Sequence, residues 1–421
     1  MKPFPTPALE PGLLRLPGRI LFGRGVLADA PAETGRLGRR ALLCTDENIA
    51  RTAGFAQLVD GLVREGVTTY IYDCTPAEVP GPSVQECLEV ARGEPIDVVI
   101  GFGGGSSIDM AKACALLATH GPPLDRYYGE GALPGPVLPV VAIPTTAGTG
   151  SEVTPVAVVS DSAKRLKVGI SSTHLIPAAA ICDPELTLSC PSNVTAYSGV
   201  DALVHAIEAY LAPPRSTNST SVEVFRGRSA FTAGFALRAV NLVENALERS
   251  VVDGGEIESR EQMLFASLNA GIAFGHAGTA GAHALQYPVG TATRTPHGLG
   301  VALLAPYVLE YVRPAALPQL RDVAVALGND VAHLSDDAAA GSAIDEVERL
   351  ADAVGIPRSL AEIGVLREEL SHFAAEALKI TRLLKNSPRA LDLEALTAIL
   401  EAAWSGERAS LRVSRSGDKP S

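Results

Sequence analysis

The chain has 421 residues, of which 47% are hydrophobic and 19% are charged, and its net charge at pH 7 is −12. This composition is typical of a globular protein with two or three domains and a large core, and it excludes a disordered chain. Lys and Arg number 35 against 47 Asp and Glu, without a basic cluster. We therefore expect no nucleic-acid partner, because phosphate binding needs concentrated positive charge. No apolar run has the length and character of a membrane span, so we expect no membrane partner either.

Two features indicate the compartment. The six cysteines are scattered and form no CxxC pair, which is typical of free thiols in a reducing environment. The N-terminal segment MKPFPTPALEPG is rich in proline and lacks the apolar run of a signal peptide. We therefore expect a cytoplasmic protein.

Short β-rich runs alternate with amphipathic runs in the first part of the chain. We expect strands over residues 40–46, 67–73, 97–105, 139–146 and 178–183. Continuous apolar strands that alternate with helices predict a parallel sheet covered on both faces, which is a nucleotide-binding type of architecture. We assign residues 1–190 to an α/β dinucleotide-binding domain.

After Pro191 the sequence becomes rich in Ala and Leu and has helical periodicity. We expect helices over residues 193–211, 221–249, 257–286, 297–312, 317–328, 341–354, 367–379 and 391–404. Their ends fall at Pro- and Gly-containing segments such as PPRST, DGG and YPVG. The sequence therefore predicts an all-helical second domain of residues 191–421.

A glycine turn follows the third expected strand, in the segment VVIGFGGGSSIDMAK. Gly103, Gly104, Gly105 and Ser106 make the turn, and a helix begins with Asp109 in its first turns. The backbone N–H groups of such a turn and the positive end of the helix favour a pyrophosphate. The spacing matches neither GxGxxG nor GxxxxGK[ST], so a tight strand-to-helix turn is the alternative interpretation.

Two further places could contact a nucleotide. The segment IPTTAGTGSEVT offers hydroxyls for ribose, phosphate or nicotinamide, unless it is an ordinary connection; these hydroxyls belong to Thr145, Thr146, Thr149 and Ser151. Asp46 ends the first expected strand, where a carboxylate can accept hydrogen bonds from an adenosine ribose and repel a 2′-phosphate. This position favours NAD over NADP. Asp46 could also cap the next helix, and the two roles are compatible.

A pattern of acidic and histidine residues in the helical part predicts a metal site. Asp201 and His205 are four residues apart in SGVDALVHAIEAY, so a helix places them on one face. His276, His283 and His297 follow in an Ala- and Gly-rich stretch, and the residues alone do not decide which three of the four histidines bind. Carboxylate and imidazole ligands suit Fe2+, Zn2+ or Mn2+. For any one histidine, a structural role in the core is the alternative.

Taken together, these motifs resemble the iron-containing (group III) alcohol dehydrogenases, relatives of glycerol dehydrogenase and dehydroquinate synthase. The resemblance covers about residues 18–405 and is carried by GGGSSIDMAK, PTTAGTGSEVT, DPELTLSCP, SGVDALVHAIEAY, AGAHALQYPVG, PHG and NSPR. It implies a dehydroquinate synthase-like fold with the active site in the cleft between the domains. It also implies NAD(H) and Fe2+ as cofactors, with Zn2+ as the other possible metal, and a homodimer or higher homo-oligomer.

The resemblance also assigns residues. The family's metal ligands match Asp201, His205, His283 and His297, and His276 falls outside this set. The family's cofactor contacts match Asp46, Gly103, Gly104, Gly105, Ser106, Asp109, Thr145, Thr146, Thr149, Ser151 and Lys167. Many members have a histidine four residues after the third ligand, where this chain has Tyr287. Tyr287 and His276 are therefore the side-chain candidates for proton transfer.

The resemblance implies an NAD(H)-linked alcohol dehydrogenase or aldehyde reductase. In such an enzyme the metal acts as a Lewis acid while a hydride moves between nicotinamide and a small alcohol or aldehyde. The alternative is a hydroxyacid–oxoacid transhydrogenase or a reductase of an aldehyde that carries a carboxylate or phosphonate. This alternative depends on Tyr287, because transhydrogenases also have Tyr there, and on Arg294, which could bind an acid or be a surface charge.

Overall fold

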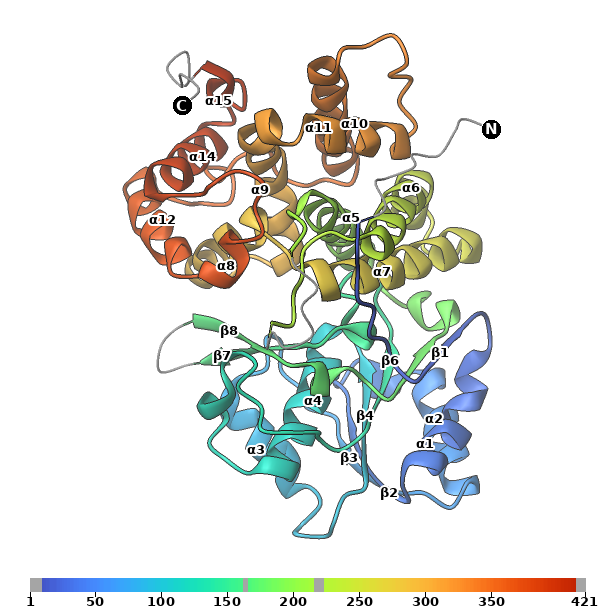
Figure 1. Ribbon diagram of the computed structural model, residues 1–421. Coiled ribbons are helices and arrows are strands. Elements are labelled where there is room, and N and C mark those ends of the chain that lie inside the picture. The colour runs from blue at the N-terminus through green and yellow to red at the C-terminus, as the bar shows by residue number, and fades with distance from the viewer. Residues whose placement is uncertain (1–9, 162–165, 216–222, 414–421) are drawn as a thin grey trace.

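The computed structural model describes residues 10–161, 166–215 and 223–413. A region built on a β-sheet is followed by a helical region (Figure 1). The main sheet has six parallel strands in the order β1 (Arg19–Phe22), β9 (Ala179–Cys182), β6 (Val140–Pro144), β4 (Val98–Gly103), β2 (Arg40–Cys44) and β3 (Thr68–Tyr72). The predicted parallel sheet and its five predicted strands are confirmed, and β1 is an additional edge strand.

Helices cover both faces of this sheet. The helices α1 (Ala30–Leu37) and α2 (Ala53–Arg64) lie on one side, and α3 (Gly81–Glu89) and α4 (Gly105–His120) lie on the other (Figure 1). Side chains alternate along a strand, so Leu42 and Val99 belong to one apolar core while Leu43 and Ile100 belong to the opposite one. Burial on both faces explains why these strands are continuously apolar.

A second, smaller sheet was not predicted. Its strands are β5 (Gly129–Glu130), β8 (Leu166–Ser171) and β7 (Val156–Asp161), in that order, and β7 pairs antiparallel with β8. It lies between the main sheet and the helical region (Figure 1). The sequence analysis expected no strand between residues 146 and 178, which was wrong, because the apolar run VAVV forms part of β7.

The second half of the described chain is helical, as predicted. Its helices are α5 (Ser192–Leu211), α6 (Ala230–Val252), α7 (Ile257–Ala277), α8 (Gly281–Thr293), α9 (His297–Val312), α10 (Leu317–Ala326), α11 (Asp336–Ala353), α12 (Leu370–Leu378), α13 (Thr381–Leu384), α14 (Leu393–Ser405) and α15 (Ser410–Val413). None of the helices in the described ranges has the length and apolar character to cross a membrane. The change from strands to helices falls between β9 and α5, and the division into domains at residue 190 stays a prediction.

One predicted helix is in fact two. The sequence analysis expected a single helix over residues 257–286, but α7 ends at Ala277 and α8 begins at Gly281. The break follows from Gly278, whose φ of 89° is a left-handed conformation that side-chain-bearing residues rarely adopt. Consequently His283 lies in the first turn of a new helix, and its direction is set independently of α7.

Candidate active site

A cavity of about 610 Å³ has walls from both the sheet region and the helical region. The predicted site residues that line it are Gly105, Ser106, Asp109, Thr149, Ser151, Lys167, Asp201, His205, His283, Tyr287 and His297. The structure therefore brings the predicted metal ligands and the glycine turn to one space. His276 is not among the described residues that line it.

The first two predicted ligands lie on α5, a largely buried helix. Asp201 and His205 are 3% and 6% exposed, and His205 Nε2 lies 3.9 Å from Asp201 Oδ1. The helix places them on one face because they are four residues apart. The ring of Phe274 stacks on His205 with ring centroids 4.2 Å apart, which fixes the plane of the imidazole.

The other two ligands come from the starts of two helices. His283 lies in the first turn of α8 and His297 is the first residue of α9. His283 Nε2 is 3.4 Å from Asp201 Oδ1, and one ligand atom each of Asp201, His283 and His297 lies within 4.8 Å of the others. The His205 and His283 rings stack with centroids 4.5 Å apart, so all four side chains converge on one place.

Glu208 supports this cluster and was missed by the sequence analysis. Its Oε2 accepts hydrogen bonds from His283 Nδ1 at 2.7 Å and from the Ala280 amide at 2.6 Å, and its Oε1 accepts from the Ala282 amide at 2.8 Å. It therefore satisfies the free N–H groups at the start of α8 and holds Nδ1 of His283, so that Nε2 is the nitrogen that faces Asp201. Its position two turns after Asp201 was the available sequence signal.

The buried atoms of the cluster fit a divalent cation. Asp201 Oδ1 and His283 Nε2 face each other and have no hydrogen-bond partner. Buried polar atoms that lack a hydrogen-bond partner are costly inside a protein. A cation between them satisfies both, and a ligand set of one carboxylate and three imidazoles suits Fe2+ or Zn2+.

Protonation of the cluster also favours a cation. Burial lowers the pKa of His205 to about 4 and that of His297 to about 3, so both rings are neutral and offer lone pairs at neutral pH. Burial by itself would raise the pKa of Asp201, but His205 and His297 hold it well below its usual range. Burial by itself would lower the pKa of His283, but Glu208 and Asp201 raise it to about 9. The cluster therefore combines an ionised carboxylate and two neutral imidazoles with a third imidazole whose surroundings favour a positive charge.

The glycine turn joins β4 to α4 at the cavity. Gly103 has a φ of 153°, and a Cβ there would lie 2.4 Å from Ser107 Oγ, so no other residue fits. Thr146 and Thr149 pack beside the turn, because a Cβ at Gly104 or Gly105 would lie 3.5 Å or 2.8 Å from their methyl groups. Of the turn, Gly105 and Ser106 at the start of α4 line the cavity, and phosphate binding there stays a prediction.

Two predicted cofactor contacts, Asp109 and Ser151, also hold the fold together. Asp109 accepts hydrogen bonds from Ser151 Oγ at 2.6 Å and from the Val158 amide at 2.9 Å. The wholly buried Lys112 donates to the carbonyls of Ser151, Thr154 and Val156 at 2.7 to 2.9 Å. These bonds fix the threonine-rich loop against α4, and Thr145 joins it through a backbone bond to the Gly103 carbonyl.

Asp46 makes the capping contacts that the sequence analysis gave as one of its two expected roles. Its Oδ1 accepts from the amides of Asn48 and Ile49 at 2.9 Å and 3.1 Å. A Cβ at Gly103 would lie 3.8 Å from its Oδ2, so the carboxylate stands beside the glycine turn. The ribose contact stays a prediction and is compatible with the cap.

The two proton-transfer candidates differ in their surroundings. Tyr287 lies one turn after His283 and lines the cavity, with its ring 6.3 Å from that of His297. The Nδ1 of His276 instead contacts the Ile272 carbonyl at 2.8 Å, and its Nε2 accepts from the Arg15 amide at 2.7 Å. Both nitrogens of His276 thus make backbone contacts, so only Tyr287 is kept in the function proposed below.

Three basic side chains line the same cavity. Lys167 Nζ is paired with Glu78 Oε1 at 2.6 Å. Arg294, at the end of α8, and Arg382, on α13, form no ion pair with a carboxylate of the described residues. The Arg382 guanidinium lies over the Phe225 ring, 5.3 Å from its centroid. Sequence analysis did not find Arg382, because no motif marks it.

Comparison with known proteins finds similarity along most of the chain. The family model "Iron-containing alcohol dehydrogenase" matches residues 17–184, and "Fe-containing alcohol dehydrogenase family, C-terminal" matches residues 195–404. Long-chain-alcohol dehydrogenase 1 of Geobacillus thermodenitrificans is 36% identical over 92% of this chain and 97% of its own length.

Two solved structures are also similar. That of 1,3-propanediol oxidoreductase has a TM-score of 0.87 at 32% identity and covers 93% of this chain and 99% of its own. That of sulfoacetaldehyde reductase from Bifidobacterium kashiwanohense in complex with NAD+ has a TM-score of 0.80 at 27% identity and covers 94% of this chain and 100% of its own. The fold class predicted from the sequence is confirmed, and the chain belongs to the iron-containing alcohol dehydrogenase family.

Proposed function

We propose that Asp201, His205, His283 and His297 hold one divalent cation, Fe2+ or Zn2+, and that the glycine turn holds the phosphates of NAD(H) in the same cavity. The observation that carries this proposal is the pair of buried, unpartnered atoms Asp201 Oδ1 and His283 Nε2, 3.4 Å apart at the cavity wall. The proposed activity is the interconversion of a small alcohol and its aldehyde.

The chemistry depends on groups that the protein positions. A cation held by the four ligands would supply a Lewis acid for the substrate oxygen, and bound NAD(H) would supply the hydride donor or acceptor. Glu208 holds Nδ1 of His283 and thereby aims Nε2 at the cluster. Burial raises the pKa of the Tyr287 phenol, so it stays protonated at neutral pH and can donate a hydrogen bond to a developing charge on the substrate oxygen.

Metal analysis together with an activity assay tests this proposal. We expect the chain purified without oxygen and loaded with Fe2+ to oxidise NADH when small aldehydes are added. His283→Ala should lose bound metal and activity while keeping its helical circular dichroism. His333→Ala, which changes an exposed histidine, is the matched control and should keep both. Full activity of metal-free His283→Ala would refute the assignment.

A second candidate function is reduction of an aldehyde that carries an acidic group. The specific observation is that Arg294 and Arg382 line the cavity without a carboxylate partner among the described residues, whereas Lys167 has one. A guanidinium binds carboxylates, sulfonates and phosphonates with paired hydrogen bonds. We propose Arg382 as the main contact, because it is half-buried and held over Phe225, while Arg294 is exposed.

Substrates matched in chain length separate the two candidates. If the substrate is anionic, Arg382→Leu should raise KM for a four-carbon aldehyde with a terminal carboxylate about 10- to 100-fold, the usual value of a charge-assisted hydrogen bond. KM for the uncharged four-carbon aldehyde should stay the same. Arg367→Leu, an arginine over the Trp404 ring outside the cavity, is the control. Equal KM changes for both aldehydes would contradict anion recognition.

A transhydrogenase is distinguished by its use of free nucleotide. Steady oxidation of added NADH with one aldehyde, in the absence of a second acid, favours a reductase. Hydride passage between a hydroxyacid and an oxoacid without free NADH favours the transhydrogenase.

We further propose that the protein acts in the cytoplasm as a homodimer or higher homo-oligomer. All six cysteines are free thiols, which supports a reducing compartment. β1 is an edge strand of the main sheet and could pair with a second copy. Light scattering during gel filtration measures the mass, and a monomer at micromolar concentration would contradict this proposal.

A further inference from the structure

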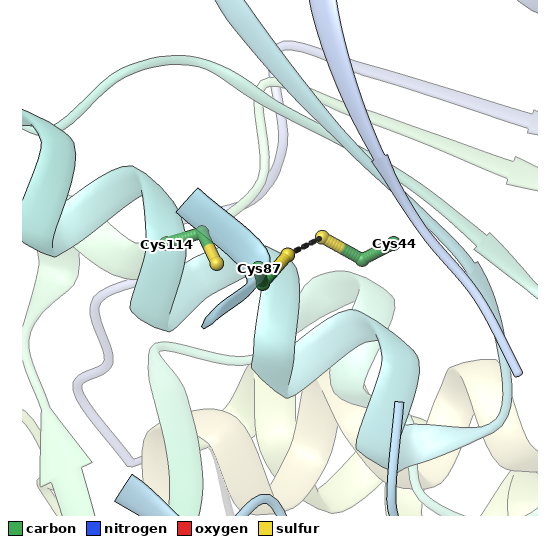
Figure 2. A group of neighbouring side chains, drawn as sticks. All are labelled: Cys44, Cys87 and Cys114. Atoms are coloured by element: carbon green, nitrogen blue, oxygen red, sulfur yellow. Dashed lines mark hydrogen bonds between the residues drawn. The ribbon is translucent and has the colours of Figure 1, made fainter. Parts of the chain in front are cut away.

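Three cysteines from separate elements meet inside the sheet region, and none of them belongs to a motif of the sequence analysis. Cys44 ends β2, Cys87 lies on α3 and Cys114 lies on α4 (Figure 2). All three are fully buried, and their sulfur atoms all lie within 4.8 Å of one another. The Cys44 and Cys87 sulfurs are 3.5 Å apart. We name these three residues the thiol cluster.

The sulfur spacing suits a three-coordinate centre. Bonds from a thiolate sulfur to a bound metal are about 2.3 Å long. Three such bonds to one atom place the three sulfurs roughly 3.5–4 Å from one another. The thiol cluster is already close to this arrangement. No fourth metal-ligating side chain of the described residues belongs to the group, and structural zinc sites almost always have four ligands. The cluster is therefore a poor zinc site.

The net charge of the occupied site distinguishes the ions that three thiolates could bind. The three thiols lie in an apolar core with residues such as Leu42, Val84 and Val99, and the ionisable groups that act on them are the thiols themselves. Three thiolates around Zn2+ carry one net negative charge, and around Cu+ they carry two. A buried charge without a partner is costly. Three thiolates around a trivalent centre carry none.

We propose that the thiol cluster is a binding site for trivalent arsenic, taken up as arsenous acid. Three As–S bonds form and three As–O bonds break, and each thiol proton leaves with a hydroxyl group as water. Arsenic stays in the +3 state throughout, so the exchange needs neither oxidant nor reductant. The product is neutral, which suits the apolar surroundings.

The helix that carries Cys87 offers a route of entry. α3 is preceded by Glu78 and Val79, with φ of 66° and 46°, and is followed by Arg92, with φ of 49°. Left-handed backbone is unfavourable for these residues, above all for the β-branched Val79. Strained ends favour local opening of a segment without global unfolding. We infer that movement of α3 exposes the thiol cluster to the acid.

Thiol counting and native mass spectrometry test the proposal on the full chain, using arsenite as the probe. Without small thiols present, one arsenic atom should bind per chain, and the thiols titrated after unfolding should fall from six to three. Cys87→Ala and, separately, Cys114→Ala should weaken arsenite binding at least tenfold. Cys74→Ala removes an exposed thiol and is the matched control, with binding unchanged.

Three results would overturn the proposal. The first is equal arsenite affinity in the folded Cys87→Ala and wild-type chains. The second is loss of thiols other than the three named, and the third is displacement of the arsenic by an equimolar amount of Zn2+. Circular dichroism of each variant establishes that it is folded. Because hydride transfer is not the readout, the result does not depend on the proposed function.

Discussion

The metal cluster around Asp201 and the thiol cluster around Cys87 are both buried, and each is assembled from three elements, but they differ in what burial leaves unsatisfied. In the metal cluster an ionised carboxylate and an imidazole nitrogen face one another without a hydrogen-bond partner, at the wall of a cavity. In the thiol cluster weakly polar sulfurs sit in an apolar core, where free cysteine behaves as a small hydrophobe. The first cluster is incomplete without a cation, whereas the second is stable by itself and only able to take a ligand.

The largest expected effect follows from the incomplete cluster. We expect Fe2+ at a thousandfold excess over its dissociation constant to stabilise the chain by about 4 kcal/mol, and a chelator to remove this gain. The reason is that the cation satisfies Asp201 Oδ1 and His283 Nε2 in the folded state alone. Urea unfolding without oxygen, with metal or with chelator, measures the difference.

Variants from the two clusters serve as matched controls for this measurement. Cys87→Ala should keep the full stabilisation by Fe2+, since its sulfur lies outside the metal cluster. His283→Ala should lose it. If Fe2+ stabilises both variants by the same amount, the stabilisation does not come from the metal cluster.

Glu152 shows what burial does to a carboxylate without imidazoles around it. Burial raises its pKa from 4.5 to about 7, and the Lys112 charge only partly offsets this. Between pH 4.5 and about 7 the folded chain therefore binds more protons than the unfolded chain, and its stability falls as the pH rises through this range. Since one pKa unit corresponds to about 1.4 kcal/mol, Glu152→Gln should stabilise the chain by up to about 3 kcal/mol above pH 7.

Urea unfolding at pH 5 and pH 8 checks this prediction. The gain from Glu152→Gln should be small at pH 5 and large at pH 8. Glu65→Gln, at the surface, is the control. A gain that is the same at both pH values would mean that the side chain acts through packing and not through its charge.

Glu208 is the carboxylate that connects the metal cluster to the fold. Glu208→Gln should lower affinity for the divalent cation about 10- to 100-fold, the usual cost of losing the partner of a ligating histidine. Glu310→Gln is the matched control, because Glu310 is equally buried but pairs with Arg313 and Arg412 far from the cavity. Isothermal titration with Zn2+ compares them, and equal affinities would remove Glu208 from the site.

Much of this site was predictable because its signals are local. The spacing of Asp201 and His205 carries over directly to one face of α5, and the apolar runs of the main sheet need both faces covered. Glu208 was equally regular in spacing but was overlooked, because its role depends on a helix break at Gly278 that the periodicity concealed.

Other features depend on chain folding over long separations, for which the sequence has no signal. Arg382 reaches the cavity from α13, a four-residue helix that no pattern indicated. Cys44, Cys87 and Cys114 have no motif spacing, and only the parallel topology brings their three elements together. Proximity of this kind follows from the fold and not from the order of residues.

The smallest expected effect concerns the thiol cluster without its ligand. If the three sulfurs act only as apolar filling, Cys114→Ala should cost about 1 kcal/mol of stability, close to the value of one buried methylene group. Cys182→Ala, a buried cysteine in another core, should cost the same, and neither should alter kcat. A markedly larger loss for Cys114→Ala in urea unfolding would mean that the thiol contacts hold the elements together, and that the thiol cluster, like the metal cluster, depends on specific polar pairing.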